Sequence, residues 1–397
     1  MTRSAIALVM VIAAAGCRIE ASASASASAS ASASASASAD AKVRTAIETA
    51  AVPGMAYAVV TRERERFVAG SGVGDLELRT RVDAATVFEA ASIAKLLVAV
   101  CVMQLVEEGK LDLDGDASKY LGFAIRHPRG STLITLRMLL AHRASIRDPQ
   151  DESPAPRTPA NALGPFLERT MIDGGKPRAA SYLDDEPGTA TTYSNVGASL
   201  AALAVERAAH ETFADVANRR VLVPLRMRDT TWVAPARPSA SAARPYARVA
   251  GGFVALPSPC HALYPAVDLH SSARDLARFA RAMLRDGELD GARILSASSV
   301  RVMTTAVDGD ADQALAWQLR TIGNAQARMR VLGHEGEDAG ATTALFIDRA
   351  TGTGVVVLAN GDAFSSGDSL RAAAIQSLLV ELLAAASPAP ATAHAAH

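Results

Sequence analysis

The segment from Ala90 to Val106 is apolar except for one formal charge, the ammonium of Lys95. A helix that is apolar on nearly all sides is a buried helix, so the fold must surround this segment with other elements. Ser92 precedes Lys95 by three residues, and side chains at that spacing share one helix face. We therefore expect the amine to reach the serine hydroxyl inside the core.

This pair has the properties of a nucleophile and its base. Burial among aliphatic groups disfavours the charged ammonium and favours a neutral amine that can accept a proton. Ser92 stands where the helix should begin, beside free N–H groups and the positive end of the helix dipole. Only five of the 40 basic residues are lysine, and an arginine could not act as a base at position 95. On these residues alone, a capping serine and a lysine that extends its amine to the surface are an equal alternative.

The composition describes a globular chain with a large core. Hydrophobic residues make up 49% of the 397 residues and charged residues 20%. A net charge of −1 and an aromatic content of 4% give no reason to expect a nucleic-acid partner. The three cysteines are not a disulfide framework and have no neighbours that form a metal site. Cys101 is expected in the core, and a bond between Cys101 and Cys260 stays open.

The N-terminus has the features of an export signal. Arg3 precedes an apolar run, Ala5 to Ala15, which is too short to span a bilayer permanently. The run ends at Cys17, as in bacterial lipoprotein signals, so residues 1–17 are expected to be the signal and Cys17 the lipidated residue. An ordinary cleaved signal is the alternative. Residues 18–40, mostly alternating Ala and Ser, are expected to be a low-complexity tether, and residues 387–397 a disordered tail. These features predict a lipid-anchored protein of the bacterial cell envelope.

Residues 41–386 are expected to form one α+β domain. Strand patterns occur near both ends of this region, at Met55–Val60, Phe67–Gly70, Leu315–Ile322, Ala327–Gly333, Ala341–Ile347 and Gly354–Ala359. Helical patterns occupy Ala41–Ala50, Thr135–His142, Gly197–Ala209, Phe213–Val221, Ser272–Leu284 and Ser369–Ala385. This order predicts one antiparallel sheet built from both chain ends, about 41–115 and 306–386, with a mostly helical insertion at about 116–305. The loop Ile146–Ala160 is a plausible rim of a site.

Two further motifs extend the serine–lysine pair. Tyr193-Ser194-Asn195 follows Pro187-Gly188 and precedes a helix, where a tyrosine near a lysine loses its proton more easily. His334-Glu335-Gly336 lies at the end of a predicted strand, where glycine lets a substrate approach the strand edge and the N–H of Glu337 could face an oxyanion. Taken alone, the first motif reads better as an ordinary loop before a helix, and the second as a turn.

In this order the three motifs resemble those of the serine β-lactamase and penicillin-binding protein superfamily, in its class C-related branch. That branch includes D-Ala-D-Ala carboxypeptidases, D-aminopeptidases and esterases of the same fold. The likeness extends to Val52-Pro53-Gly54-Met55 and to the residues around the serine helix, and it covers about Ala51 to Asn360. It implies a β-lactamase/transpeptidase-like fold and a reaction that needs no metal or organic cofactor.

The resemblance also implies a role for each matching residue. Ser92 would attack a carbonyl carbon, and Lys95 and Tyr193 would take its proton and pass it to the leaving group. The N–H groups of Ser92 and Glu337 would form the oxyanion hole. Asn195 would orient the substrate or the lysine, and His334 and Gly336 would line the strand on which the substrate lies.

This chain departs from the family pattern at three places. His334 replaces a lysine that holds the carboxylate of β-lactams, and a near-neutral imidazole holds it less well, which favours a peptidase or an esterase. Arg143-Ala144-Ser145 follows His142 in place of Thr-Ser-Gly, and Val267-Asp268 replaces a glycine pair. Asp268 and His270 could form an acid–base pair, although two polar loop residues are usually just solvated.

The sequence therefore predicts a serine hydrolase that acts through an acyl-enzyme on an ester, an amide or a D-amino-acid peptide. Its partners would be a small-molecule or peptide substrate and the membrane. A D-Ala-D-Ala carboxypeptidase acting on peptidoglycan and a β-lactamase are the alternatives within the superfamily. A non-catalytic envelope binding module is an alternative of another class, although such a module would have no physical need of Lys95.

Overall fold

The computed structural model describes residues 34, 36–150, 162–232, 241–258, 260–323 and 328–386. The predicted signal with Cys17, most of the predicted tether, and the tail 387–397 lie outside these residues. A helix runs through residues 36–50 and so begins inside the Ala-Ser tract, earlier than Ala41. Alanine is the strongest helix former, and Ala39 is buried in the same core cluster as Val43.

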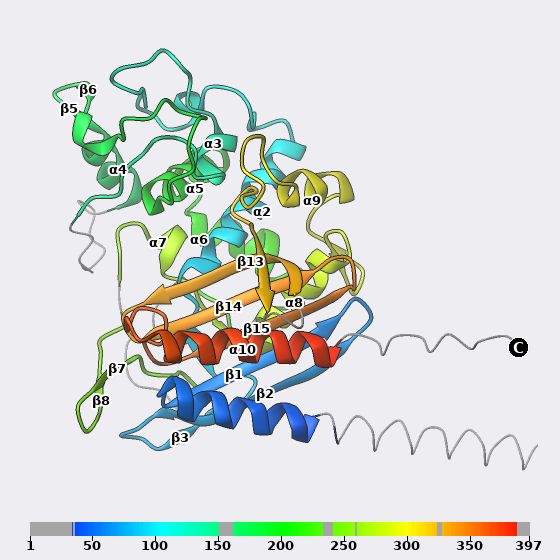
Figure 1. The fold of residues 1–397 in the computed structure, drawn as a ribbon. Coiled ribbons are helices and arrows are strands. Elements are labelled where there is room, and N and C mark those ends of the chain that lie inside the picture. The colour runs from blue at the N-terminus through cyan, green and yellow to red at the C-terminus, as the bar shows by residue number, and fades with distance from the viewer. Residues whose placement is uncertain are drawn as a thin grey trace, which may run out of the picture.

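A seven-stranded antiparallel sheet forms the centre of the molecule (Figure 1). Its strand order is β12-β13-β14-β15-β1-β2-β3, so strands from both chain ends meet where β1 pairs with β15. This arrangement confirms the α+β fold predicted from the sequence. The strands are β1 (Gly54–Thr61), β2 (Glu65–Asp75), β3 (Thr80–Arg81), β12 (Gln318–Gly323), β13 (Arg328–Asp338), β14 (Ala341–Asp348) and β15 (Thr353–Ala359).

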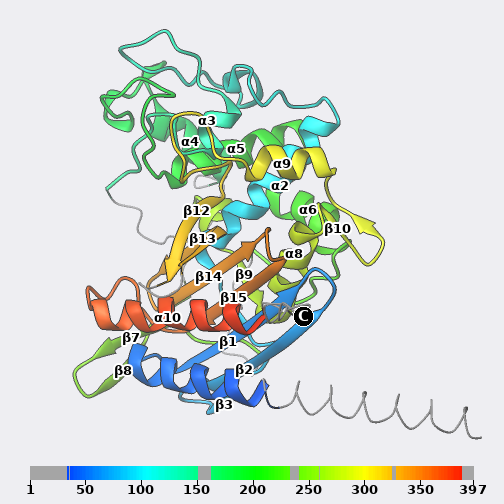
Figure 2. The ribbon, with the colours of Figure 1, turned by 45° about the vertical axis from the view of Figure 1, so that its right-hand side comes forward.

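Helices cover both faces of the sheet because alternate residues of its central strands are apolar on each side. On β1, Tyr57 and Val59 belong to the core cluster shared with the helix of residues 36–50 and with α10 (Ser369–Ala386). Ala56 and Ala58 belong to the larger cluster on the other face, which includes α8 (Ala273–Leu284). Figure 2 shows α10 and α8 on opposite sides of the strands.

The length and apolar composition of α10 would allow it to cross a membrane. Here it packs along the sheet, and its buried residues include Leu378, Leu379 and Leu382.

Most of the remaining chain forms the helical part above the sheet in Figure 1. Its central element is α2 (Ala94–Glu107), buried from Ala94 to Leu105 as the sequence predicted. The described 3₁₀ and α elements around it are η1 (Ala91–Ile93), η2 (Ala117–Tyr120), α3 (Leu136–Leu140), α4 (Leu163–Met171), η4 (Ala179–Ser181), α5 (Asn195–Ala209), α6 (Phe213–Ala217), α7 (Tyr264–Val267) and α9 (Ala297–Thr304), and a π-helical turn, η5 (Asn218–Leu222), follows α6. Four short strand pairs lie outside the main sheet: β4 (Val87–Glu89) with β9 (His270–Ser272), β5 (Ile172–Asp173) with β6 (Lys176–Pro177), β7 (Tyr246–Val249) with β8 (Gly252–Ala255), and β10 (Glu288–Leu289) with β11 (Ala292–Arg293).

Two details differ from the sequence-based expectation. Helix α8 was expected within the helical insertion, yet it packs on the sheet because its strongly amphipathic sequence presents one apolar face to β1 and β15. Strand β13 continues through His334-Glu335-Gly336 to Asp338, and the motif lies within the strand rather than at its end. Strand β14 pairs with β13 over this whole length, with Gly336 opposite Thr343.

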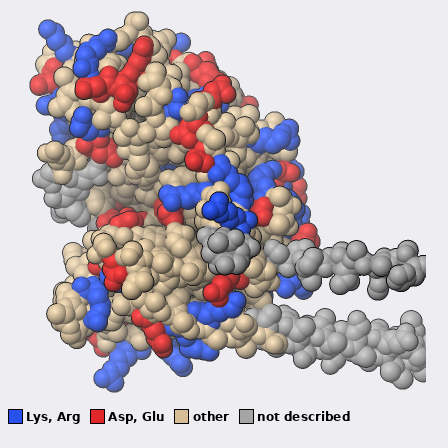
Figure 3. Space-filling model, in the orientation of Figure 1, with Lys and Arg blue, Asp and Glu red and all other residues tan. Residues whose placement is uncertain are grey.

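Acidic and basic side chains are interspersed on the face of the molecule shown in Figure 3.

Candidate active site

The turn that carries Ser92 is held in place from two sides. The main-chain N–H of Ala90 donates to Leu269 O (2.7 Å), and Thr343 Oγ1 donates to Ala90 O (3.1 Å). Ala91 then adopts a left-handed conformation (φ 46°), which is unfavourable for a residue with a Cβ. Such strain persists only where surrounding contacts enforce it, and it is concentrated at functional sites. Ser92 follows at once and is partly exposed at the start of the buried helix.

Lys95 lies directly beneath the serine. Its side chain is fully buried, and Nζ donates to Ser92 Oγ (2.9 Å) and to Ala266 O (2.9 Å). The spacing of one helical turn thus brings amine and hydroxyl into contact, as expected from their shared face. The carbonyl of Ala266, in α7, orients the amine from the other side.

Tyr193 approaches the same oxygen from the helical part. Its Oη donates to Ser92 Oγ (2.7 Å), and the Lys95 Nζ lies 4.8 Å from the centre of its ring. Tyr193 is 41% exposed and so lies between the buried amine and the solvent. The fold therefore brings Tyr193 to Ser92 and Lys95, although Tyr193 and Ser92 are 101 positions apart in the sequence.

Strand β13 passes very close to the serine turn. A Cβ on Gly336 would lie 2.6 Å from Ala90 O and 3.3 Å from the Cβ of Ala91, so only glycine permits this approach. Glu337 follows, paired with Thr342 of β14. The edge of β13 that the sequence predicted to line the site thus adjoins Ser92.

Asn195 is the first residue of α5, and its position depends on an aspartate that sequence reasoning missed. Asp148 accepts hydrogen bonds from Asn195 N (2.7 Å), Val196 N (3.0 Å) and Ser194 Oγ (2.6 Å). A carboxylate at a helix N-terminus satisfies free N–H groups and interacts favourably with the helix dipole. Asp148 therefore holds the Tyr193-Ser194-Asn195 segment in place. The only sequence signal for it was its position in the loop predicted to form a rim.

Two buried histidines flank the Tyr193 ring, with ring centres 4.5 Å (His142) and 5.8 Å (His334) away. Burial, and then the nearby charge of Lys95, lower the pKa of His334 to about 3. The same two causes, followed by His334 itself, hold the pKa of His142 well below its usual range. Both imidazoles are therefore neutral at physiological pH.

The low pKa of His334 makes its contribution to stability depend on pH. The unfolded chain binds a proton at this residue near pH 6.5, whereas the folded protein does so only near pH 3. The contribution is therefore present above pH 6.5 and is lost as the pH falls. Between pH 7 and pH 5 we expect wild type to lose about 2 kcal/mol of unfolding free energy relative to His334→Gln in urea denaturation.

The difference between the two proteins is the quantity to measure. Burial raises the pKa of Glu89 and, to about 6, that of Asp275, and these groups act on stability in the opposite sense. Subtracting the variant from wild type removes their effect. A difference that stays constant between pH 7 and pH 5 would contradict a neutral His334.

Asp268 and His270 are buried rather than solvated. Asp268 is 1% exposed and takes His261 as its partner, with Oδ1 2.5 Å from His261 Nδ1. His270 is 4% exposed and contacts the main-chain oxygen of Asp268. The expectation of solvated side chains was wrong, because α7 and the pairing of β9 with β4 enclose them. Cys101 and Cys260 are both free thiols and do not pair.

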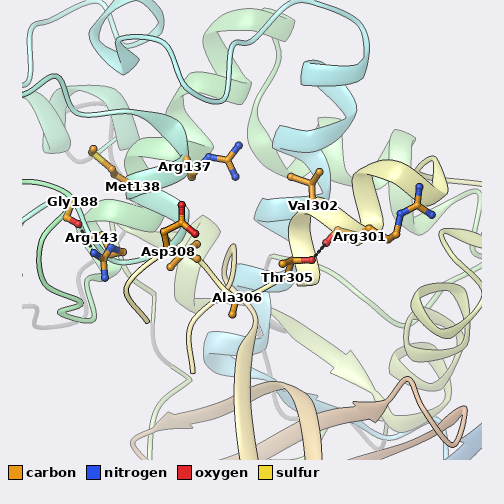
Figure 4. Close-up of a pocket in the computed structure, with 11 residues that line it drawn as sticks. Arg137, Met138, Arg143, Gly188, Arg301, Val302, Thr305, Ala306 and Asp308 are labelled. Atoms are coloured by element: carbon orange, nitrogen blue, oxygen red, sulfur yellow. Dashed lines mark hydrogen bonds between the residues drawn. The ribbon is translucent and has the colours of Figure 1, made fainter. Parts of the chain in front are cut away.

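A cavity of about 510 Å³ lies between α3, α9 and the loop after α9 (Figure 4). Arg137, Arg143 and Arg301 contribute to its lining, together with apolar side chains such as Met138 and Val302. Arg143 donates to Gly188 O and to Thr191 Oγ1, and so links this cavity to the loop that leads into Tyr193. Arg143, which departs from the family pattern, thus holds the loop that leads into Tyr193, here called the tyrosine loop.

Comparisons with known proteins identify the family to which the chain belongs. A family profile described as Beta-lactamase matches residues 39–379. "Penicillin-binding protein 4" of Amycolatopsis lactamdurans is 26% identical over 329 residues, which are 79% of this chain and 82% of that protein. The structure of a class C β-lactamase superposes with a TM-score of 0.71 at 17% identity, covering 90% of this chain and 98% of that one.

A D-alanine carboxypeptidase, AmpC from Burkholderia cenocepacia, superposes with a TM-score of 0.66 at 24% identity, covering 87% and 97% of the two chains. At these identities, both structures are evidence for the fold alone. The family profile spans most of the chain, including the serine turn, the tyrosine loop and β13. The chain therefore belongs to the Beta-lactamase family, a family of serine hydrolases related to penicillin-binding proteins.

Proposed function

We propose that this protein hydrolyses an ester, an amide or a D-amino-acid peptide through an acyl-enzyme on Ser92. One observation carries the proposal: Ser92 Oγ accepts hydrogen bonds from both Lys95 Nζ (2.9 Å) and Tyr193 Oη (2.7 Å). A nucleophile needs a base within hydrogen-bonding distance, and a buried amine next to a phenol can serve as one. A purely structural serine at a helix start would need neither group.

The reaction would proceed in two halves. As Ser92 Oγ attacks the carbonyl carbon, its proton passes to whichever of Lys95 and Tyr193 is deprotonated. The N–H groups of Ser92 and Glu337 would then stabilise the oxyanion, since β13 lies against the serine turn. The intermediate collapses as the leaving group takes that proton. In the second half, water attacks the acyl carbonyl, releases the acid and returns a proton to Ser92.

The neutral state of His334 favours substrates without a carboxylate at this position. Burial and Lys95 lower its pKa to about 3, so it offers no positive charge to an anionic group. The guanidinium of Arg320, on the neighbouring strand, already pairs with Glu335 (3.1 Å). A dedicated β-lactamase would need a cation there, and we therefore place esters and amides ahead of β-lactams. A D-Ala-D-Ala carboxypeptidase acting on peptidoglycan is the closest alternative, and the carboxylate of its substrate would be held by other groups.

We also propose that the protein is exported and anchored by a lipid on Cys17. This proposal rests on the charged start, the short apolar run and the cysteine at its end. The Ala-Ser residues before the helix of residues 36–50 would then separate the anchor from the hydrolase domain. An envelope location would bring the site to peptidoglycan or to small extracellular esters.

A substrate panel tests the proposed chemistry on the full chain and on Ser92→Ala. The panel contains a fluorophosphonate probe, a fluorescent penicillin and the p-nitrophenyl ester of a short-chain acid. We expect fluorophosphonate labelling and ester turnover in wild type, both absent from Ser92→Ala, with little turnover of penicillin. A long-lived penicilloyl adduct without ester turnover would identify a D-Ala-D-Ala carboxypeptidase instead. Absence of any Ser92-dependent labelling would overturn the proposal in favour of a binding module.

A further inference from the structure

His142 contacts the segment around Tyr193 at three points. Its main-chain oxygen accepts from Thr192 N (2.8 Å), and its Nδ1 accepts from Ser194 N (3.2 Å). Its ring lies 4.5 Å from that of Tyr193, tilted by 36°. The residues immediately before and after Tyr193 and the phenol ring itself are therefore all held by one residue. None of the roles implied by the family resemblance includes His142.

The backbone of His142 is shaped for these contacts. Its φ of 57° is left-handed, so the chain turns sharply after α3 and directs both the carbonyl and the ring toward the tyrosine loop. A left-handed residue with a side chain is uncommon and costs free energy that the contacts must offset. Only 3% of the residue is exposed.

These contacts fix which nitrogen carries the proton. An N–H group donates to His142 Nδ1, so Nδ1 must be the bare acceptor and the neutral ring carries its hydrogen on Nε2. The charged and titratable groups around it are Lys95 from α2, His334 from β13 and the phenol of Tyr193. A proton on Nδ1 would remove the acceptor of the Ser194 N–H and so break the hydrogen bond from Ser194.

His334 carries the opposite tautomer. Its Nδ1 contacts the carbonyl oxygen of Glu335, which can only accept, so Nδ1 carries the hydrogen and Nε2 is bare. Among the described residues, neither the Nε2 of His142 nor that of His334 has a hydrogen-bond partner, and both atoms are buried. The Nε2 of His142 is therefore a donor and that of His334 an acceptor.

We propose that His142 is a positioning residue, which as a neutral imidazole with its hydrogen on Nε2 holds Tyr193 against Ser92. This inference rests on the proposed function, since Tyr193 matters only if Ser92 reacts. Movement of Oη by about 1 Å would be enough to slow proton transfer substantially. His142 touches no reacting atom and acts through Tyr193.

Three substitutions separate the contacts. His142→Asn places an amide oxygen near the position of Nδ1 and tolerates a left-handed backbone. His142→Phe keeps a ring beside Tyr193 but leaves the buried Ser194 N–H without an acceptor. His142→Gln offers an acceptor only near the position of Nε2. We expect His142→Asn to acylate Ser92 within about fivefold of wild type and the other two at least about tenfold more slowly, with KM for the ester little changed.

His210 provides the matched control. It is also left-handed (φ 57°) but exposed, at the far end of α5. We expect His210→Asn and His210→Phe to acylate at the wild-type rate. Equal rates for His142→Phe and wild type would overturn the proposal, as would an equal slowing by His142→Asn and His142→Phe.

A second measurement does not depend on activity. In ¹⁵N-histidine NMR spectra of the full chain, the signals lost in His142→Asn identify His142. We expect them to report a neutral ring protonated on Nε2 at both pH 7 and pH 5. A ring protonated on Nδ1, or an imidazolium at pH 6, would overturn the proposal. If wild type fails to react with the fluorophosphonate, the proposed function fails, whereas this spectrum still decides the state of His142.

Discussion

Lys95→Ala is expected to slow the acylation of Ser92 by at least about a hundredfold, the loss typical of removing a general base. The alanine leaves Tyr193 in contact with Ser92 but removes the only amine within hydrogen-bonding distance of Oγ among the described residues. Lys95→Arg should be equally slow, because a guanidinium keeps the positive charge but cannot accept a proton. The rate of fluorophosphonate labelling at fixed probe concentration measures both variants.

Lys110→Ala is the control for this experiment. Lys110 lies just after α2 and forms an exposed ion pair with Glu108 (2.8 Å), far from any proton transfer. Its removal should leave the labelling rate unchanged. Labelling of Lys95→Ala at a near-normal rate would refute the role of the amine as base, and rapid labelling of Lys95→Arg alone would show that only its charge matters.

Gly336→Ala is expected to slow acylation about a hundredfold and to lower the free energy of unfolding by about 1–3 kcal/mol. The new Cβ would lie 2.2 Å from Thr343 Oγ1 and 2.6 Å from Ala90 O. Because Ala90 O belongs to the backbone of the serine turn, β13 and that turn must move apart. The N–H groups of Glu337 and Ser92, which we propose form the oxyanion hole, would then be displaced from each other.

Gly252→Ala tests whether any new methyl group in a strand has this effect. Gly252 lies in β8, and a Cβ there would meet no atom within 4 Å. We expect normal labelling and little change in urea denaturation for this variant. If Gly336→Ala labels as fast as Gly252→Ala, the close approach of β13 to the serine turn has no part in catalysis.

Local patterns in the sequence predicted most of the architecture. The spacing and periodicity of apolar residues place these elements: continuous apolar runs place strands such as β1 and β15, which are buried on both faces, and the long apolar run after Ser92 places the buried helix. The same periodicity could not tell that α8 covers the sheet rather than the helical part. Nor did it place the start of the first helix, which depends on Ala39 finding a partner in the core.

The candidate site also combines contacts that the sequence predicted with contacts that it did not. Ser92, in η1, and Lys95, in the first turn of α2, are one turn apart on continuous helical backbone, and this spacing brings their side chains together. Asp148 accepts hydrogen bonds from residues 46 to 48 positions further along the chain, and no local sequence pattern predicts such a contact. His142 appeared in the sequence only as the end of a helix, and its neutral state depends on burial and on Lys95.

By itself, then, the sequence determined that a hydroxyl and an amine share one face of a buried helix, and that strands from both chain ends form one sheet. Those features follow from short-range periodicity and from the need to remove apolar surface from water. Only the tertiary structure decided that Tyr193 and β13 reach the same serine, and that the histidines beside them are neutral. Distances between distant segments, and the loss of solvent that sets a pKa, exist only once the chain has folded.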